Sequence, residues 1–295
     1  MTETTRVTVR APDEAAAARL AEILSTVFED EGFPVSHYEI ENGAAWLAEI
    51  LFLDRGPEEA GPAAAEALAG AGAGIADGAL VADTVAEDDW VAASLARLSP
   101  VTVGPFLLHG SHDRAAARGR RLAIEIDAAL AFGTGHHATT VGCLDAWVRL
   151  RKAGFRPRTV LDLGTGTGVL AIGVARSQPV WALATDIDPV AVHVARENVV
   201  LNRAHPSVTT IVADGFAHPL LAKTCFDLVF ANILARPLIA LAPRLTASVA
   251  PGGALVLSGL RVEDVRRIVA TYRARGMILR HRFIRDGWAA LTFTR

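Results

Sequence analysis

Two glycine-rich stretches lie about thirty residues apart in the middle of the chain. The first, "AFGTGHH", covers residues 131–137, and the second, "LDLGTGTGVLA", covers residues 161–171. Glycine has no Cβ, so its backbone can approach a bound molecule closely and can adopt positive φ angles. One such turn is common in a long chain. Two turns so close together predict that both contact one cofactor.

The second stretch places Gly164, Gly166 and Gly168 directly after residues 160–163, a run typical of a buried strand. The glycine spacing is G-x-G-x-G, whereas nucleotide-phosphate loops need G-x-G-x-x-G or a Lys after the last glycine. Here Val follows the last glycine, and no Lys comes after it. Asp162, just before the turn, would repel a pyrophosphate and attract a cation. The turn therefore favours a positively charged ligand, with a plain tight turn as the alternative.

Two further acidic residues follow the next strands. Asp186 comes about 20 residues after Gly164, the usual position of a carboxylate that accepts hydrogen bonds from ribose hydroxyls. Asp214, after the third strand, could reach an adenine amino group. An adenosine without phosphate that carries a positive charge describes S-adenosylmethionine (SAM). We therefore predict SAM as the cofactor.

Asn232, in "FANIL", ends the fourth strand, next to where a methyl group would be delivered. An Asn amide and nearby backbone carbonyls can accept hydrogen bonds from an attacking amine and so hold its lone pair toward the methyl. Asn232 is our predicted catalytic residue. The alternative is that Asn232 caps the helix that begins near Leu234, and the two roles are compatible.

The first glycine-rich stretch precedes a predicted helix that Thr139 or Thr140 would cap. If this stretch covers the cofactor, Phe132 could contact it and a Thr hydroxyl could bind its methionine end. His136 and His137 raise the question of a metal site. Adjacent side chains rarely converge on one ion, and no further ligands stand at motif spacing, so we predict no metal.

From about residue 120 on the pattern changes, and the elements that position these residues alternate between strand and helix. This order predicts a doubly wound parallel sheet, and a terminal hairpin around Asp286-Gly287 adds antiparallel strands to it. The predicted strands cover residues 158–164, 180–188, 207–215, 226–234 and 252–260, and the predicted helices cover 189–202, 237–250 and about 262–275.

The first hundred residues predict a β-α-β-β-α-β unit, the ferredoxin-like arrangement, with a hairpin turn at Asn42-Gly43. This unit has no His, Cys and carboxylate cluster, so we assign it to recognition. The predicted domains are residues 1–100 for substrate recognition, a linker over 101–120, and a cofactor-binding domain over 121–295. Pro100 and Pro105 interrupt "SPVTVGPFLLHGSHD" and suggest that this stretch is a connector. The arginine-rich run at 114–121 favours a solvated linker face over a patch that touches substrate or RNA.

Composition narrows the class of protein. The chain has 295 residues, 51% of them hydrophobic, but no run of 18 apolar residues and no signal-like start. Cys143 and Cys225 form no metal-like or redox-like pair and are expected to be cytosolic thiols. A net charge of −3 and a pI of about 6.3 are unusual for a protein that binds nucleic acid. We expect a cytoplasmic protein with no membrane contact and no stable nucleic-acid partner.

At these residues the chain resembles the ribosomal protein L-eleven (L11) methyltransferases of the PrmA type. The matching stretches are "LAFGTGHHATT", "VLDLGTGTGVLAI", "DIDPVAVHVARENVVLN", "FDLVFANILARPLIALAP" and "PGGALVLSG". They follow the order of the family over most of residues 129–259. Near the N-terminus, "WLAEILF" and "VAEDDWVAASLARLSPV" match more loosely. The glycine turn occurs in many methyltransferases, whereas "AFGTGHHATT" together with "ANIL" is much more specific.

The resemblance implies an α/β fold: a Rossmann-like seven-stranded methyltransferase domain with a C-terminal antiparallel hairpin, preceded by a ferredoxin-like α+β domain that holds the substrate. It implies methylation of lysine side chains and the α-amine of L11, free or on the large subunit. By match to the family motifs, the cofactor-binding residues would include Thr140, Gly164, Asp186 and Asn232. One departure is "NRAHPSV", which stands where the family has Asn-Gly after the second helix.

The expected reaction is an in-line displacement at the sulfonium methyl, in which the enzyme mainly supplies proximity and orientation. The amine must lose its proton before attack, and no dedicated base is assigned. Three alternatives stay open. The same fold could methylate another protein, an RNA or a small molecule. It could be an NAD-dependent oxidoreductase, although the glycine spacing and Asp162 argue against that. It could also be a binding module without turnover.

Overall fold

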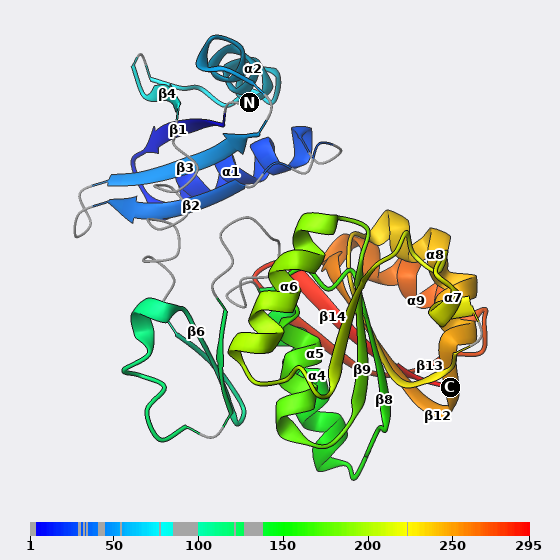
Figure 1. Ribbon diagram of the computed structural model, residues 1–295. Helices are drawn as coiled ribbons and strands as arrows, with labels where there is room; N and C mark the ends of the chain where they lie inside the picture. The colour runs from blue at the N-terminus through cyan, green and yellow to red at the C-terminus, as the bar shows by residue number, and fades with distance from the viewer. Residues whose placement is uncertain are drawn as a thin grey trace. The chain divides into compact units, whose positions relative to one another are not determined.

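The computed structural model describes residues 4–28, 31, 33, 35–40, 45–53, 55–76, 78–84, 100–120, 122–126, 138–222 and 224–295. The chain divides into two compact units, Met1–Ala93 and Ser94–Arg295 (Figure 1). The predicted Asn42-Gly43 turn and the glycine-rich stretch at 131–137 lie outside the described residues.

The smaller unit is a four-stranded antiparallel sheet in the order β2-β3-β1-β4, which is the ferredoxin-like order. Its elements are β1 (Thr5–Ala11), α1 (Glu14–Val27), β2 (Val35–Ile40), β3 (Ala45–Phe52), α2 (Pro57–Gly70) and β4 (Leu80–Thr84). Alternate residues of β1, such as Val7 and Val9, join Leu24 and Leu68 of the two helices in one core. The β-α-β-β-α-β prediction is therefore confirmed.

The larger unit is built on a seven-stranded sheet in the order β10-β9-β8-β11-β12-β14-β13 (Figure 1). Its strands are β8 (Thr159–Leu163), β9 (Trp181–Asp186), β10 (Val208–Val212), β11 (Phe226–Asn232), β12 (Val249–Arg261), β13 (Ile278–Arg285) and β14 (Trp288–Thr294). The first five strands of that order run parallel. β14 is antiparallel to both β12 and β13, which confirms the predicted terminal hairpin.

Helices cover both faces of this sheet, because its strands alternate apolar side chains between two cores. Val160 of β8 packs with α4 and α5, whereas the next residue, Leu161, packs with α8 and α9. The helices are α4 (Ala138–Lys152), α5 (Val169–Ser177), α6 (Pro189–Leu201), α7 (Pro219–Ala222), α8 (Ala235–Ser248) and α9 (Val265–Arg273), with short 3-10 turns at η1 (Ser111–Asp113) and η2 (Val262–Asp264). The doubly wound prediction is confirmed.

The segment predicted to be a linker, residues 101–120, differs from that expectation. It holds β5 (Val101–Val103) and β6 (Phe106–His109), which form a second, three-stranded sheet with β7 (Leu122–Glu125). Phe106 and Leu108 are fully buried in the core that contains α4 and α5. Pro105, which suggested a chain break, forms the hairpin turn with Gly104 instead, and the φ of Gly104 is +55°. Burial of these apolar side chains makes residues 101–109 part of the larger unit.

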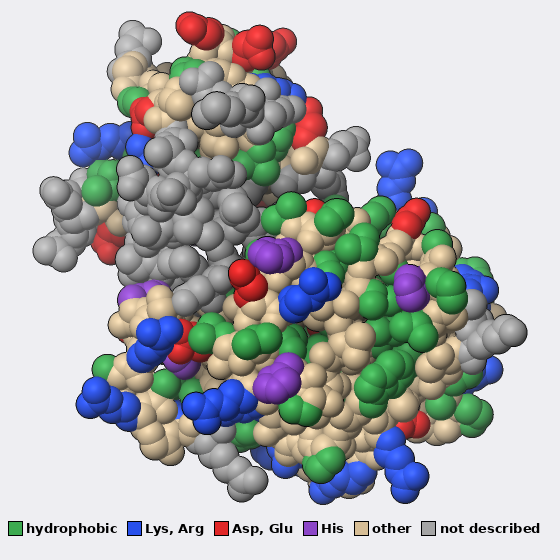
Figure 2. Space-filling model, in the orientation of Figure 1, with side chains coloured by type: hydrophobic (Ala, Val, Ile, Leu, Met, Phe, Trp, Pro, Cys, Tyr) green, Lys and Arg blue, Asp and Glu red, His purple; other side chains and the backbone are tan. Residues whose placement is uncertain are grey.

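The surface of the larger unit mixes side-chain types. Figure 2 shows hydrophobic side chains interspersed with charged ones over the face that carries α6 and β9. Val190 and Val200 of α6 are exposed apolar residues. Within the described ranges, no helix is both long enough and apolar enough to span a bilayer.

Candidate cofactor and active site

The second glycine-rich stretch forms a turn that folds over the end of β9. The φ angles of Gly164, Gly166 and Gly168 are +69°, +53° and +83°, a region that strongly favours glycine. The backbone N–H groups of Gly164 and Thr165 donate to the carbonyl oxygen of Thr185, at 2.8 and 2.9 Å. Gly168 is the residue before α5. The turn is therefore a shaped backbone cradle at the carboxyl edge of the sheet.

Asp186 ends β9 directly under this cradle. Its Oδ2 accepts the N–H of Gly166 at 2.9 Å, and its Oδ1 accepts the N–H of Asp188 at 3.1 Å. Each carboxylate oxygen has a second lone-pair direction, so both can still accept from a ligand hydroxyl. The N–H of Ala213 donates to the carbonyl oxygen of Asp186, which brings the neighbouring Asp214 to the same edge, where it is exposed.

Asp162 lies fully buried at the start of the turn. Its Oδ2 accepts from Thr165 Oγ1 at 2.7 Å and from the N–H of Ala171 at 3.2 Å, whereas its Oδ1 has no partner among the described residues. Burial raises the pKa of this carboxyl to about 7, against the opposing effect of those two hydrogen bonds. The nearby Asp186 raises the pKa further. A cation beside Asp162 would favour its ionised form.

Asn232 ends β11, which pairs with β8 on one side and β12 on the other. In the sheet, β9 lies on one side of β8 and β11 lies on the other, so the strand order reverses at β8. Ligands bind at such switch points, and Asn232 and Gly164 flank this one. α8 begins only at Ala235, after Leu234, and has no side-chain cap. The suggested capping role of Asn232 is therefore wrong.

Thr140 lies inside the first turn of α4, where it is fully buried. Either Thr139 or Thr140 was expected to cap this helix, but both lie within α4, which already includes Ala138. The Oγ of Ser258, on β12, lies 3.3 Å from the carbonyl oxygen of Thr139. Because Ser258 pairs with Asn232 across the sheet, the first turn of α4 belongs to the same edge.

Four buried oxygens at this edge have no hydrogen-bond partner within the described part of the chain. They are Thr140 Oγ1, Asp162 Oδ1, Thr185 Oγ1 and Asn232 Oδ1. An unsatisfied buried polar group costs roughly 1–3 kcal/mol, so such oxygens fit a ligand that donates hydrogen bonds. The hydroxyl and ammonium groups of SAM are donors of this kind. The residues present therefore fit the predicted cofactor.

The structure brings together the predicted residues Thr140, Gly164, Gly166, Asp186 and Asn232, and it puts Asp214 beside them. Phe132 and the two histidines lie outside the described residues. Sequence reasoning missed Thr185, which precedes Asp186 in β9, and Ser258, which pairs with Asn232 across the sheet. No group of three metal-ligating side chains occurs in the described ranges.

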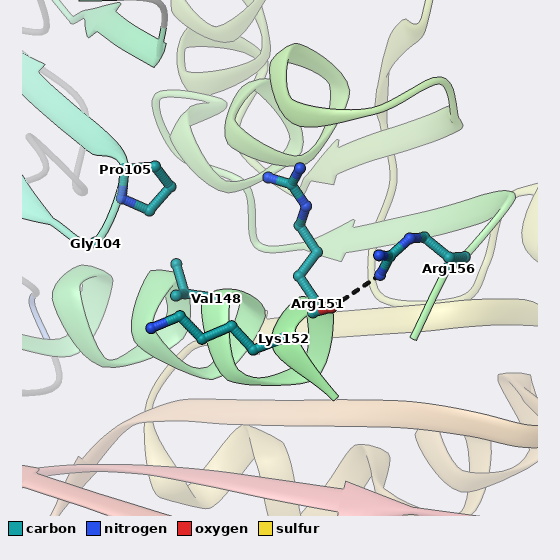
Figure 3. Close-up of a pocket in the computed structure, with 6 residues that line it drawn as sticks. All are labelled: Gly104, Pro105, Val148, Arg151, Lys152 and Arg156. Atoms are coloured by element: carbon teal, nitrogen blue, oxygen red, sulfur yellow. Dashed lines mark hydrogen bonds between the residues drawn. The ribbon is translucent and has the colours of Figure 1, made fainter. Parts of the chain in front are cut away.

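A separate cavity of about 450 Å³ lies at the other end of α4 (Figure 3). It is lined by Gly104, Pro105, Val148, Arg151, Lys152 and Arg156. Arg156 Nη1 donates to the carbonyl oxygen of Arg151 at 2.8 Å, and cations at a helix C-terminus are favourable with its dipole. Thr140 lies at the start of the same helix, so this cavity is not the candidate site.

The chain is similar to known proteins over most of its length. The family model for ribosomal protein L11 methyltransferase (PrmA) matches residues 55–295. The chain is 42% identical over 283 residues to a ribosomal protein L11 methyltransferase of Brucella abortus (strain S19), covering 96% of each chain. It is 44% identical over 294 residues to one of Rhodopseudomonas palustris (strain BisB5), covering 99% of this chain and 98% of that relative.

A solved structure shares the fold. It is a ribosomal protein L11 methylase from Lactobacillus delbrueckii subsp. bulgaricus, with a TM-score of 0.57 and 24% sequence identity. The match covers 67% of this chain and 99% of that one.

Proposed function

The chain belongs to the ribosomal protein L11 methyltransferase (PrmA) family of SAM-dependent enzymes, and on that premise we propose that it methylates lysine side-chain and N-terminal amines of L11. The observation that carries the reaction is the carboxamide of Asn232. Its Oδ1 is buried, has no partner in the described chain, and lies at the switch point beside the glycine turn.

The residues that would hold SAM follow from the donors and acceptors at this edge. The Asp186 carboxylate would accept from the ribose hydroxyls, and Asp214 from the adenine amino group. Thr140 and Asp162 would face the methionine end, where an ammonium and a sulfonium carry positive charge. The glycine turn would let the backbone approach the ligand closely.

When bound, SAM supplies an electrophilic methyl group on its sulfonium sulfur. Asn232 Oδ1 accepts an N–H of the incoming amine and so directs the nitrogen lone pair toward that methyl. A lysine amine has a pKa near 10.4, and partial burial in the site lowers that pKa before attack. The nitrogen–carbon bond would form as the carbon–sulfur bond breaks, with the electron pair of that bond going to sulfur and the amine proton to water. Orientation of the amine is the main contribution of this chain.

The smaller unit, in this proposal, recognises the protein substrate. Its sheet and two helices form a separate core, and its described residues contain no group of His, Cys, Asp and Glu side chains that could hold a metal ion. We also assign the protein to the cytoplasm, because the bacterial relatives are named for action on a ribosomal protein.

The test uses radiolabelled SAM, the purified chain, and ribosomal proteins from a strain that lacks the enzyme. We expect label on L11. Label on RNA or on another protein would keep the chemistry and reject the substrate. Tight SAM binding without any label would indicate a binding module or a small-molecule methyltransferase.

Asn232→Ala should lower the rate of methyl transfer by about 100-fold, because a misplaced acceptor loses its in-line geometry. The matched control is Leu234→Ala, two residues further along the same loop, where the side chain is exposed. This control should transfer label at the wild-type rate. Equal rates in the two variants would remove Asn232 from the mechanism. Asp186→Ala should instead lose SAM binding, which calorimetry measures directly.

A further inference from the structure

The motif "LSG" at residues 257–259 produces an irregularity in β12 next to the active site. The pairing of β12 with β14 shifts register between Leu257 and Leu260, which makes Ser258 and Gly259 a bulge. Gly259 has a φ of +78°. Ser258 is the residue that pairs with Asn232 on β11. Bulges beside active sites commonly re-aim side chains or end a pairing.

Gly259 lies against the backbone of Ile233, the residue that follows Asn232. A Cβ added at Gly259 would stand 2.5 Å from the carbonyl oxygen of Ile233, 2.8 Å from its carbonyl carbon and 3.0 Å from its nitrogen. These are backbone atoms, so they cannot move aside as the end of a side chain can. Only glycine at this position allows the acceptor loop its observed path.

The side chain of Ile233 reaches the cofactor turn on the other side. A Cβ at Gly164 would stand 2.3 Å from Ile233 Cγ2. Ile233 therefore fills the space between the glycine turn and the bulge, so a shift of the bulge moves the residue beside Asn232 relative to the cofactor.

Ser258 links the bulge to a third part of the site. Its buried Oγ lies 3.3 Å from the carbonyl oxygen of Thr139 and 3.1 Å from that of Ala289. The bulge is thus in contact with the first turn of α4, with the acceptor loop after β11 and with β14.

We propose that the Ser258-Gly259 bulge is a positioning element that sets the distance between the acceptor loop at Asn232 and the cofactor turn. This inference rests on the proposed function, because the distance matters only if an amine attacks a bound methyl group. Neither residue touches the reacting atoms; both act through Asn232, Ile233 and the first turn of α4.

The test compares Gly259→Ala with Gly252→Ala in the full chain. Gly252 lies in the same strand with a φ of +75°, but nothing stands within 4 Å of its would-be Cβ. Both variants place a side chain at a similar positive φ, and only Gly259→Ala adds the clash. Steady-state methylation of L11 at saturating SAM gives kcat, and calorimetry gives the Kd for SAM.

We expect Gly259→Ala to lose about 100-fold in kcat, the order that a 1 Å misplacement can cost, while its Kd for SAM changes less than about threefold. Equal kcat in the two variants would overturn the proposal, and so would a loss that comes only from weaker SAM binding. If Gly259→Ala does not fold, Ser258→Ala tests the proposal instead, because this substitution adds no atoms to the bulge. A several-fold drop in its kcat supports the bulge, and a wild-type kcat rejects it. Label transfer by the wild-type chain is measured first, so a wrong substrate is recognised separately.

Discussion

Asp162 has an unusual environment for an acidic residue, since it is fully buried and shares its site with another carboxylate, Asp186. The raised pKa of Asp162, about 7, means that its protonated form is favoured in the folded chain relative to an unfolded value near 3.9. The resulting contribution to stability is present below that unfolded value and is lost as pH rises through about 7. A bound cation would offset this loss.

At the residue scale we therefore expect the affinity for SAM to rise between pH 5.5 and about 7 and then to level off. The positive charge of SAM favours ionised Asp162, so binding below pH 7 releases a proton. Calorimetric titrations in buffers of different ionisation enthalpy measure both quantities. Asp162→Asn should abolish the pH slope and the proton release, whereas Asp264→Asn, on η2, should retain them. A wild-type affinity independent of pH would contradict the assignment.

At the end of α6, where the resemblance led us to expect Asn-Gly, the chain has Asn202-Arg203. Asn202 ends the helix, and the next residue, Arg203, has a φ of +54°. The N–H groups of Arg203 and Ala204 donate to the carbonyl oxygens of Val200 and Val199, at 2.9 and 2.8 Å. This is a Schellman ending, in which glycine is preferred at the position that Arg203 occupies.

At the element scale, Arg203→Gly should stabilise the protein by about 0.5–1 kcal/mol, because the left-handed strain that it removes outweighs the greater entropy of glycine in the unfolded chain. The side chain of Arg203 is exposed, so little packing is lost. Thermal unfolding should show a midpoint about 2 °C higher. Asp286→Gly is the control, since aspartate tolerates its φ of +51° and the gain should be smaller. An unchanged or lower midpoint for Arg203→Gly would refute this explanation.

Asn202 also connects elements that lie far apart in the sequence. Its Nδ2 donates to the carbonyl oxygen of Glu125 at 2.7 Å, and its Oδ1 accepts the N–H of Glu125 at 2.9 Å. The side chain of Asn198 donates to the carbonyl oxygen of Thr167 in the glycine turn at 3.0 Å. The two asparagines of "ARENVVLN" therefore connect α6 by hydrogen bonds to the glycine turn and to the end of β7.

At the scale of the whole molecule, the two units have separate cores. The smaller unit has one, around Ile50 and Phe52, and the larger unit has two, one on each face of its sheet. All the described site residues belong to the larger unit. Cofactor binding should therefore act on one unit and leave the other unchanged.

We expect two calorimetric unfolding transitions, of which SAM raises only the one of Ser94–Arg295. At SAM a hundredfold above its Kd, the stabilisation is about 2.7 kcal/mol, or a shift of about 5–10 °C for a unit of this size. Asp186→Ala should show no shift. A joint shift of both transitions would mean that the smaller unit takes part in cofactor binding or unfolds together with the larger one.

Much of the fold followed from local pattern. The apolar runs, the helical periodicity and the turn dipeptides predicted the element order of both units, because each of these signals lies within a few residues of chain. The exception was residues 101–109. Pro100 and Pro105 suggested a connector. In the structure, Phe106 and Leu108 pack against α4 and α5, which come later in the sequence. Burial that depends on residues far away in the sequence cannot be predicted from the local pattern of apolar residues.

The sequence by itself determined the candidate chemistry, because glycine spacing and acids at strand ends follow from the period of strands and turns. Only the tertiary structure decided how those residues meet. It buried Asp162 and so raised its pKa, it excluded Asn232 as a helix cap, and it brought Gly259 against Ile233. Each of these depends on contacts across the sheet, where burial and close approach are properties of strand order and register rather than of any one segment.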